Sequence, residues 1–222
     1  MNLIEVIKQL DLNLFLVING LHSPFFDQFM YAVSYKMTWV PLYIAVLFVL
    51  VKHWKRESIW LILALVICVV ISDQVASGLL KNLIKRLRPS HVDELKDIIH
   101  LVKGYTGGMY GFASSHASNA VGFALLSSLL LKKKAYSFSI FAWAIVTAYS
   151  RVYLGVHYPL DILGGTVIGI MAALLCYGFI YKYRPSLLKH EAYTEIERPV
   201  ALVPVSVLVL SFLGIIVYSF VS

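Results

Sequence analysis

Charged residues are scarce in this chain of 222 residues. Asp, Glu, Lys and Arg make up 14% of it, and hydrophobic residues make up 59%. Soluble domains have about 25% charged and roughly 45–50% apolar residues, so the composition excludes a soluble monomer. The apolar residues fall in long blocks rather than short repeats, which excludes disorder, collagen and a coiled coil. The composition therefore predicts a one-domain protein that crosses a membrane several times.

Cysteine is also scarce, and two further patterns are missing. Cys68 and Cys176 each lie inside an apolar block, which argues against a disulfide framework and a cysteine-based metal site. No basic stretch is long enough to form a nucleic-acid-binding arm. No obligate protein partner is evident. The sequence therefore predicts a protein whose partners are the lipid bilayer and a membrane-embedded substrate.

Long apolar stretches are what the chain has instead. A hydrocarbon core of about 30 Å needs about 20 apolar residues per helix. Six stretches approach this length, and we expect an all-α, polytopic membrane bundle of about six transmembrane helices, at roughly 37–52, 58–80, 114–131, 136–154, 161–181 and 200–221.

Residues 1–36 are predicted to form an N-terminal segment distinct from the membrane domain at 37–222. Met1–Leu10 mixes acidic, basic and apolar residues. This pattern is typical of an amphipathic helix that lies in the membrane interface. Whether the segment spans the bilayer or lies on it stays open at this point.

The net charge of +7 indicates an orientation. The three loops after the first, third and fifth stretches are rich in Lys and Arg, and positively charged loops stay in the cytoplasm. The loops at 81–113 and 155–160 then lie on the outer side, although 81–113 is itself basic. Since the topology rule does not explain these outer charges, we expect them to bind phosphate.

The first polar segment on that side runs from Lys81 to Arg88-Pro89. A seven-residue step is about two helical turns, so Lys81 and Arg88 are predicted to share one helix face before Pro89 ends the helix. The alternative is that these residues are only positive anchors at a helix end.

The second segment is Phe112-Ala113-Ser114-Ser115-His116, where the third apolar stretch begins. Ser114 is a natural N-cap, and the free N–H groups of a helix N-terminus bind anions. His116 is expected in the first helical turn. The alternative for this residue is an interfacial histidine with no chemical role.

The third segment runs from Ser150-Arg151 to His157 and Asp161. Ionisable groups are costly near lipid unless they pair or act. If Pro159 starts the next helix, Asp161 can reach the imidazole of His157 and set its tautomer. The alternative is a structural pair between Arg151 and Asp161.

Together the segments supply three cations, two histidines, one carboxylate and a helix N-terminus, which suits phosphoryl transfer. Arg and Lys would neutralise the phosphate oxygens, one His would attack phosphorus, and the other would protonate the leaving oxygen. No acidic cluster suited to Mg²⁺ or Zn²⁺ lies near these residues. We therefore expect a reaction that needs no metal and no other cofactor.

These residues resemble the signatures of the type 2 phosphatidic acid phosphatase superfamily, which is related to the vanadium haloperoxidases. The first signature, Lys with six residues before Arg-Pro, matches Lys81, Arg88 and Pro89. The third matches Ser150, Arg151, His157 and Asp161 in full. The middle signature, Pro-Ser-Gly-His, has Ala113 and Ser115 in place of Pro and Gly. The resemblance covers about residues 58–181, and its signatures lie within 81–161.

The resemblance implies that 37–222 is a membrane phosphatase domain and gives each residue a role. His157 is the nucleophile that forms a phosphohistidine, Asp161 orients it, and His116 is the general acid. The implied phosphate ligands are Lys81, Arg88, Ser114 and Arg151, to which Ser115 can add a hydroxyl donor.

The function implied is a lipid phosphatase of the inner membrane whose active site faces the periplasm. The Phe-Ala-Ser-Ser-His variant resembles phosphatases of the Bacteroides group and favours a lipid A phosphate as substrate. Undecaprenyl pyrophosphate and phosphatidylglycerol phosphate are the alternatives. A non-enzymatic lipid-phosphate binder or flippase would not need His157 and His116. A haloperoxidase is disfavoured by six apolar stretches and no soluble body.

Overall fold

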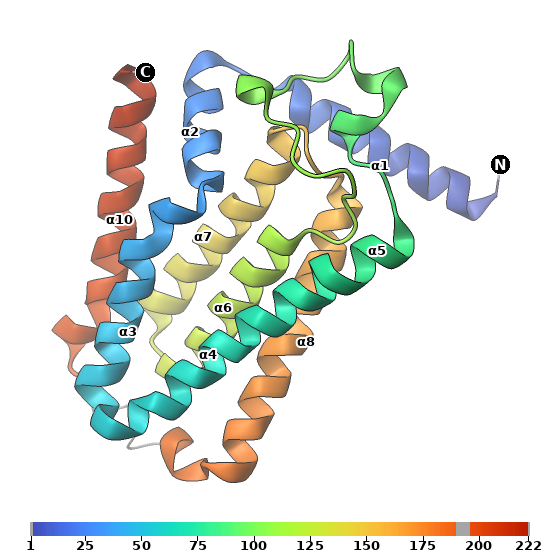
Figure 1. Cartoon of the computed structure of the whole chain (residues 1–222). Coiled ribbons are helices and arrows are strands. Elements are labelled where there is room, and N and C mark those ends of the chain that lie inside the picture. Colours follow the sequence, from blue (N-terminus) through green and yellow to red (C-terminus); the bar gives the residue numbers. More distant parts are fainter. Residues whose placement is uncertain (1, 190–195, 222) are drawn as a thin grey trace.

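The computed structural model describes residues 2–189 and 196–221 (Figure 1). Within these ranges the secondary structure is helical, apart from one isolated bridge between Leu87 and Tyr110. The α-helices are α1 (Leu3–Gly20), α2 (Pro24–Ser34), α3 (Val40–Trp54), α4 (Ser58–Asp73), α5 (Lys81–Ile84), α6 (Ser115–Leu131), α7 (Lys134–Tyr153), α8 (Pro159–Tyr183) and α10 (Arg198–Val221). A π-helical turn, η3 (Gln74–Leu80), joins α4 to α5, and a 3₁₀ turn, η1 (Lys36–Trp39), precedes α3.

The predicted all-α class is confirmed, and each of the six apolar stretches is helical. Within the described ranges, three helical stretches are long and apolar enough to cross a membrane: Lys36–Ile84, which contains α3 and α4, Pro159–Tyr183 and Arg198–Val221. α6 is apolar but shorter. The number of six membrane crossings stays a prediction.

The turns of the bundle lie at two ends. Figure 1 shows the turns α3–α4 and α6–α7 and the end of α8 at one end, with the 85–113 segment and the α7–α8 turn at the other. The three polar segments therefore meet at one end, as their alternation along the chain predicts. The basic loops 52–56 and 132–134 lie at the opposite end.

The contact between α6 and α8 is unusually close and brings two polar segments together. A Cβ on Gly165 would lie 2.3 Å from the carbonyl oxygen of Ser114, and one on Gly169 would lie 2.4 Å from that of Ser118. Only glycine fits at both positions, because no other residue lacks a Cβ. The N-terminus of α6 is thereby held against the start of α8, where the backbone N–H of Ser114 donates to the carbonyl oxygen of Asp161 at 2.9 Å.

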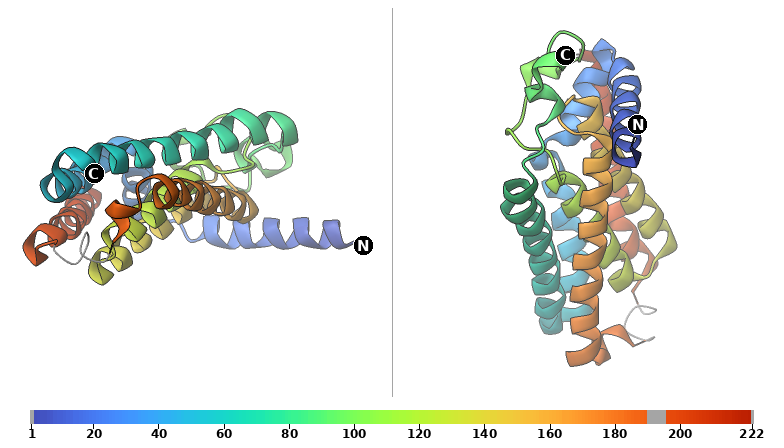
Figure 2. Two further views of the ribbon diagram at one scale, coloured as in Figure 1. Left: turned by 90° about the horizontal axis from the view of Figure 1, so that it is seen from below. Right: turned by 90° about the vertical axis from the view of Figure 1, so that its right-hand side faces the viewer.

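The described part of the N-terminal segment, residues 2–36, contains two α-helices with different surroundings. α2 packs against α7 and α10 inside the bundle. The N-terminal half of α1 extends away from the bundle (Figures 1 and 2) and exposes Leu3, Ile4 and Leu10. On the other face of α1, Asp11, Phe15 and Asn19 are buried at four-residue spacing. The interfacial position of α1 stays a prediction.

The predicted helical stacking of Lys81 and Arg88 is wrong. α5 ends at Ile84, where Lys85 adopts a left-handed conformation with φ of 50°. Arg88 is extended, as the residue before a proline prefers to be, and its backbone N–H donates to the carbonyl oxygen of Met109 at 3.1 Å. Arg88 therefore reaches the site from an extended loop rather than from the face of a helix.

Candidate active site

His157 and Asp161 form the buried centre of the site. α8 begins at Pro159, as predicted, which places Asp161 in the first helical turn. His157 Nδ1 lies 3.3 Å from Asp161 Oδ2, and that oxygen also accepts the backbone N–H of Tyr158 at 3.0 Å. His157 is 1% exposed and Asp161 is fully buried. The predicted carboxylate–imidazole contact is present.

The neighbours of His157 determine which ring nitrogen carries the proton. Arg88 Nη1 lies 3.0 Å from His157 Nε2 and also donates to the carbonyl oxygen of Val156 at 3.0 Å. A guanidinium group can only donate, so Nε2 must accept, and the proton is on Nδ1, where it faces Asp161. The Nε2 lone pair therefore points to the cations of the site.

His157 is neutral in this environment. Burial, together with the positive charges of Arg88 and Arg151, holds the pKa of His157 well below its usual value. Burial and repulsion from Arg151 lower the pKa of Arg88 to about 10, which leaves it charged at neutral pH. A neutral imidazole is the form that can act as a nucleophile, once a bound anion draws the Arg88 N–H away from the Nε2 lone pair.

Two buried guanidinium groups beside His157 have no carboxylate partner. Arg88 is 6% exposed and Arg151 is 2% exposed, and neither has a carboxylate oxygen within 4.0 Å among the residues described. Arg151 donates to the hydroxyl groups of Ser34 and Tyr105, while its Nε has no partner in the described chain. Buried charge without a counter-ion is costly, so this geometry suits an anionic ligand. The alternative pair between Arg151 and Asp161 is absent from the described structure.

The remaining predicted residues surround the same centre. Ser114 caps α6, and its hydroxyl accepts the backbone N–H of Ala117 at 3.4 Å. Ser115 and His116 follow in the first turn of α6. Lys81 is partly buried, with Nζ 3.5 Å from the hydroxyl of Ser77, and it interacts electrostatically with Arg88 and Arg151. The eight predicted residues therefore gather at one site, and their individual roles stay predictions.

The loop before α6 packs against the site. Gly107 has a φ of 66°, and a Cβ there would lie 2.9 Å from Arg88 Nη1. A Cβ on Gly111 would lie 2.7 Å from Asp161 Oδ2. These glycines let the backbone approach Arg88 and Asp161 closely, which other residues would prevent.

Two further charged residues complete the surroundings of Asp161. Arg86 Nη1 donates to Asp161 Oδ1 at 3.0 Å, and Arg86 Nη2 donates to Asp11 Oδ2 at 2.5 Å. Asp11 also accepts the backbone N–H of Leu160 at 2.8 Å, and the Arg86 guanidinium lies 4.0 Å above the ring of Tyr158. Arg86 therefore links Asp11 on α1 to Asp161 at the start of α8.

Sequence reasoning did not assign a role to Asp11 or Arg86. Arg86 is one of several cations between 81 and 113, and no spacing rule separates it from its neighbours. Asp11 is a lone carboxylate between leucines, which is the only signal that it has a buried partner. Their partners lie 75 residues away along the chain.

Replacement of Arg86 by alanine is expected to lower kcat by about 10- to 100-fold, because Asp161 loses the contact that holds it against His157. KM is expected to change little, since Arg86 is hydrogen-bonded to Asp161 and Asp11 rather than directed at the space beside Arg88 and Arg151. Arg86→Lys should recover part of kcat. Steady-state kinetics of both variants measure kcat and KM. A 10- to 100-fold rise in KM with kcat unchanged would contradict a positioning role.

Comparisons with known proteins identify the family. The model of the PAP2 superfamily matches residues 57–185, which is more than half of the chain. The chain belongs to the PAP2 superfamily. The predicted resemblance to type 2 phosphatidic acid phosphatases is thus confirmed, and all eight predicted site residues lie inside the matched range. Asp11 lies outside it.

The named relatives of this PAP2 chain are phosphatases. A "Lipid A 4'-phosphatase" of Bacteroides thetaiotaomicron is 38% identical over 183 residues, covering 81% of this chain and 81% of the relative. A protein of the same name from Porphyromonas gingivalis is 38% identical over 179 residues, which cover 80% of this chain and 74% of the relative. An "Undecaprenyl-diphosphatase" of Sulfolobus acidocaldarius is 26% identical over 172 residues, which cover 78% of this chain and 75% of the relative.

Two solved PAP2 structures share the fold. LpxE of Aquifex aeolicus has a TM-score of 0.62 at 24% identity, covering 76% of this chain and 95% of its own. A transmembrane PAP2-type phosphatidylglycerolphosphate phosphatase of Bacillus subtilis has a TM-score of 0.62 at 21% identity, and the match covers 81% of this chain and 88% of that structure. Together with the apolar helices, these relatives make this chain a membrane protein of the same fold.

Proposed function

We propose that this PAP2 protein is a lipid phosphatase that acts through a phosphohistidine intermediate. The observation that carries the proposal is the pair of buried guanidinium groups, Arg88 and Arg151, without carboxylate partners, beside the Nε2 lone pair of His157. An anion with several oxygen acceptors satisfies both guanidinium groups at once. A phosphate held there presents its phosphorus to His157.

The reaction has two steps. His157 Nε2 attacks phosphorus, so that an N–P bond forms while the P–O bond to the lipid breaks and His116 gives its proton to the leaving oxygen. A water molecule then attacks phosphorus, the N–P bond breaks, and His116 takes the proton of the water. Asp161 stabilises the positive charge that develops on the imidazole, and Lys81, Arg88 and Arg151 stabilise the charge on the phosphate oxygens. The N–H groups at the start of α6, capped by Ser114 and joined by the Ser115 hydroxyl, add donors.

The substrate is a lipid A phosphate, and the enzyme lies in the inner membrane with its six helices crossing the bilayer and its site facing the periplasm. Two relatives named lipid A 4'-phosphatase at 38% identity support this substrate. The basic loops at the end of the bundle opposite the site support the orientation. Undecaprenyl pyrophosphate and phosphatidylglycerol phosphate are the alternative substrates, because relatives with these activities in their names also match.

Phosphate release by the purified protein tests the proposal on a matched panel of lipid A, undecaprenyl pyrophosphate, phosphatidylglycerol phosphate and phosphatidate. The expected result is the highest kcat/KM with lipid A. Comparable values on all four substrates would refute the preference for lipid A. Binding without phosphate release from any of them would instead indicate a lipid-phosphate binder or flippase.

The effects of EDTA and of vanadate on phosphate release test the metal-free mechanism separately. EDTA is expected to leave phosphate release unchanged, because protein cations neutralise the phosphate and a histidine supplies the nucleophile. Vanadate is expected to inhibit competitively, since it adopts the five-coordinate geometry of the transition state. Inactivation by EDTA that added metal reverses would overturn the metal-free mechanism.

A further inference from the structure

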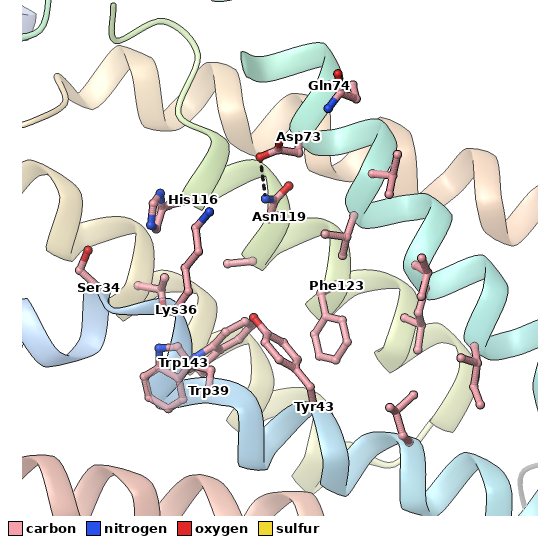
Figure 3. Close-up of a pocket in the computed structure, with 18 residues that line it drawn as sticks. Ser34, Lys36, Trp39, Tyr43, Asp73, Gln74, His116, Asn119, Phe123 and Trp143 are labelled. Carbon is pink, nitrogen blue, oxygen red and sulfur yellow. Dashed lines mark hydrogen bonds between the residues drawn. The ribbon is translucent and has the colours of Figure 1, made fainter. Parts of the chain in front are cut away.

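A cavity of about 580 Å³ opens beside His116 (Figure 3), and one of its lining residues, Ser34, accepts a hydrogen bond from Arg151. It lies between η1, α3, α4, α6 and α7. Its far part is apolar and aromatic, with contributions from Tyr43, Leu65, Val69, Phe123 and Trp143. The part nearest His116 is polar, and it contains residues that the phosphate chemistry above does not use.

Lys36, Asp73 and Asn119 are among the polar side chains that line this end of the cavity. Asn119 is one helical turn after His116 on α6, and its Nδ2 donates to Asp73 Oδ1 at 3.2 Å. The buried Oδ1 of Asn119 has no partner among the described residues. Lys36, from η1, interacts electrostatically with His116, and Figure 3 shows its ammonium group between His116 and Asn119. No described carboxylate lies within 4.0 Å of the Lys36 ammonium group.

Asp73 stands out in this group because a carboxylate among apolar helices is costly unless it pairs or has a function. It interacts electrostatically with Lys81, at the edge of the phosphate site. Its one hydrogen bond from a described side chain comes from the Asn119 amide. Asp73 is also the last residue of α4 before the π-helical turn η3, and π-helical turns occur frequently at functional sites. A carboxylate repels phosphate, so Asp73 does not serve as a phosphate ligand.

The proposed role of His116 indicates which part of the substrate lies next to Lys36, Asp73 and Asn119. His116 delivers its proton to the leaving oxygen, so groups beyond His116 on the cavity side lie next to the leaving group rather than the phosphate. A carboxylate and an unpaired amide oxygen accept hydrogen bonds, and an ammonium group donates them. This set matches the hydroxyl and amide groups of an acylated amino sugar, whereas a simple prenyl chain offers it nothing to bind.

We propose that Lys36, Asp73 and Asn119 form a leaving-group subsite that binds the sugar of a phosphorylated glycolipid, with an acyl chain in the apolar part of the cavity. The subsite rests on the proposed function, because it needs His116 to act on the leaving oxygen. It accounts for a preference for lipid A over phosphate esters without a sugar. It also assigns specificity to Lys36, which lies outside the part of the chain that the PAP2 family model matches.

The variants Asp73→Asn, Asn119→Ala and Lys36→Met test the subsite in the full-length purified protein. For each, kcat/KM for lipid A is expected to fall by about 10-fold or more, as for the loss of a hydrogen bond to a charged or otherwise unpaired buried group. With phosphatidate, which has no sugar, kcat/KM is expected to stay near the wild-type value for Asn119→Ala. Lys36 and Asp73 also interact electrostatically with His116 and Lys81, respectively, so for Lys36→Met and Asp73→Asn the measured quantity is the ratio of kcat/KM for lipid A to kcat/KM for phosphatidate, which is expected to fall by about 10-fold or more. Retained activity on phosphatidate also shows that the variant is folded and that its phosphate site is intact. Asp93→Asn and Lys134→Ala, both remote from the cavity, are the matched controls.

Product inhibition gives an independent measurement. Dephosphorylated lipid A should inhibit the wild-type enzyme, and Asp73→Asn should weaken this inhibition by about 10-fold while leaving inhibition by inorganic phosphate unchanged. Equal losses on lipid A and phosphatidate, or no loss on either, would overturn the subsite while leaving the phosphatase function intact. A wild-type enzyme that hydrolyses phosphatidate but not lipid A would instead overturn the substrate assignment and the subsite together.

Discussion

Replacement of His157 by alanine is expected to lower phosphate release by about 10⁴-fold or more, because it removes the nucleophile rather than a group that assists one. His157 Nε2 lies 3.0 Å from Arg88 Nη1 in the buried centre of the site, where the phosphate is proposed to bind. Water that enters in place of the imidazole has no neighbouring base held by Asp161. Release of labelled phosphate from a lipid substrate measures the effect.

A trapping experiment identifies the reason for this loss. Wild-type protein quenched during turnover should carry a covalent phosphate that is labile in acid and stable in base, and His157→Ala should carry none. Lys134→Ala, at the opposite end of the bundle, should retain full activity and the phosphoenzyme. Phosphate release by His157→Ala at a rate near wild type would refute the phosphohistidine mechanism.

Asp161→Asn has the second largest expected effect, a loss of about 10³- to 10⁴-fold in kcat, by analogy with the loss of the carboxylate from a Ser-His-Asp triad. Oδ1 must remain an acceptor for Arg86, so the new amide NH₂ occupies the position that faces His157 Nδ1 and the N–H of Tyr158. The imidazole must then carry its proton on Nε2, where it opposes Arg88 and removes the nucleophilic lone pair. The structure is expected to change little, because the side chains have the same shape.

Separate measurements of kcat and of vanadate inhibition test whether Asp161 sets the tautomer of His157. Vanadate should still inhibit Asp161→Asn, since the phosphate-binding cations are untouched, while turnover is nearly lost. Asp93→Asn, which removes an exposed carboxylate paired with Lys96, should leave both quantities unchanged. If Asp161→Asn keeps more than a tenth of wild-type kcat, then Asp161 does not determine the tautomer of His157.

Local sequence patterns were sufficient for much of the fold and the centre of the site. The apolar stretches correspond to helices because helix formation in a membrane depends on composition within about 20 neighbouring residues. The N-cap at Ser114, the helix start at Pro159 and the contact from Asp161 to His157 are all decided within four residues along the chain. The prediction that Lys81 and Arg88 share a helix face failed because helical spacing assumes a continuous helix, whereas α5 ends at Ile84, between the two residues.

By itself the sequence determined the helical class, the meeting of three polar segments at one end, and eight residues of one site. The tertiary structure alone decided how that site is supported and extended. Asp11 reaches Arg86 and the Leu160 N–H only because α1 lies against the start of α8. Lys36 lines the same cavity as Asp73 and Asn119 only because η1 lies beside α4 and α6. The physical reason is that helix periodicity relates residues within a few turns, whereas contacts between distant helices depend on how the whole bundle packs.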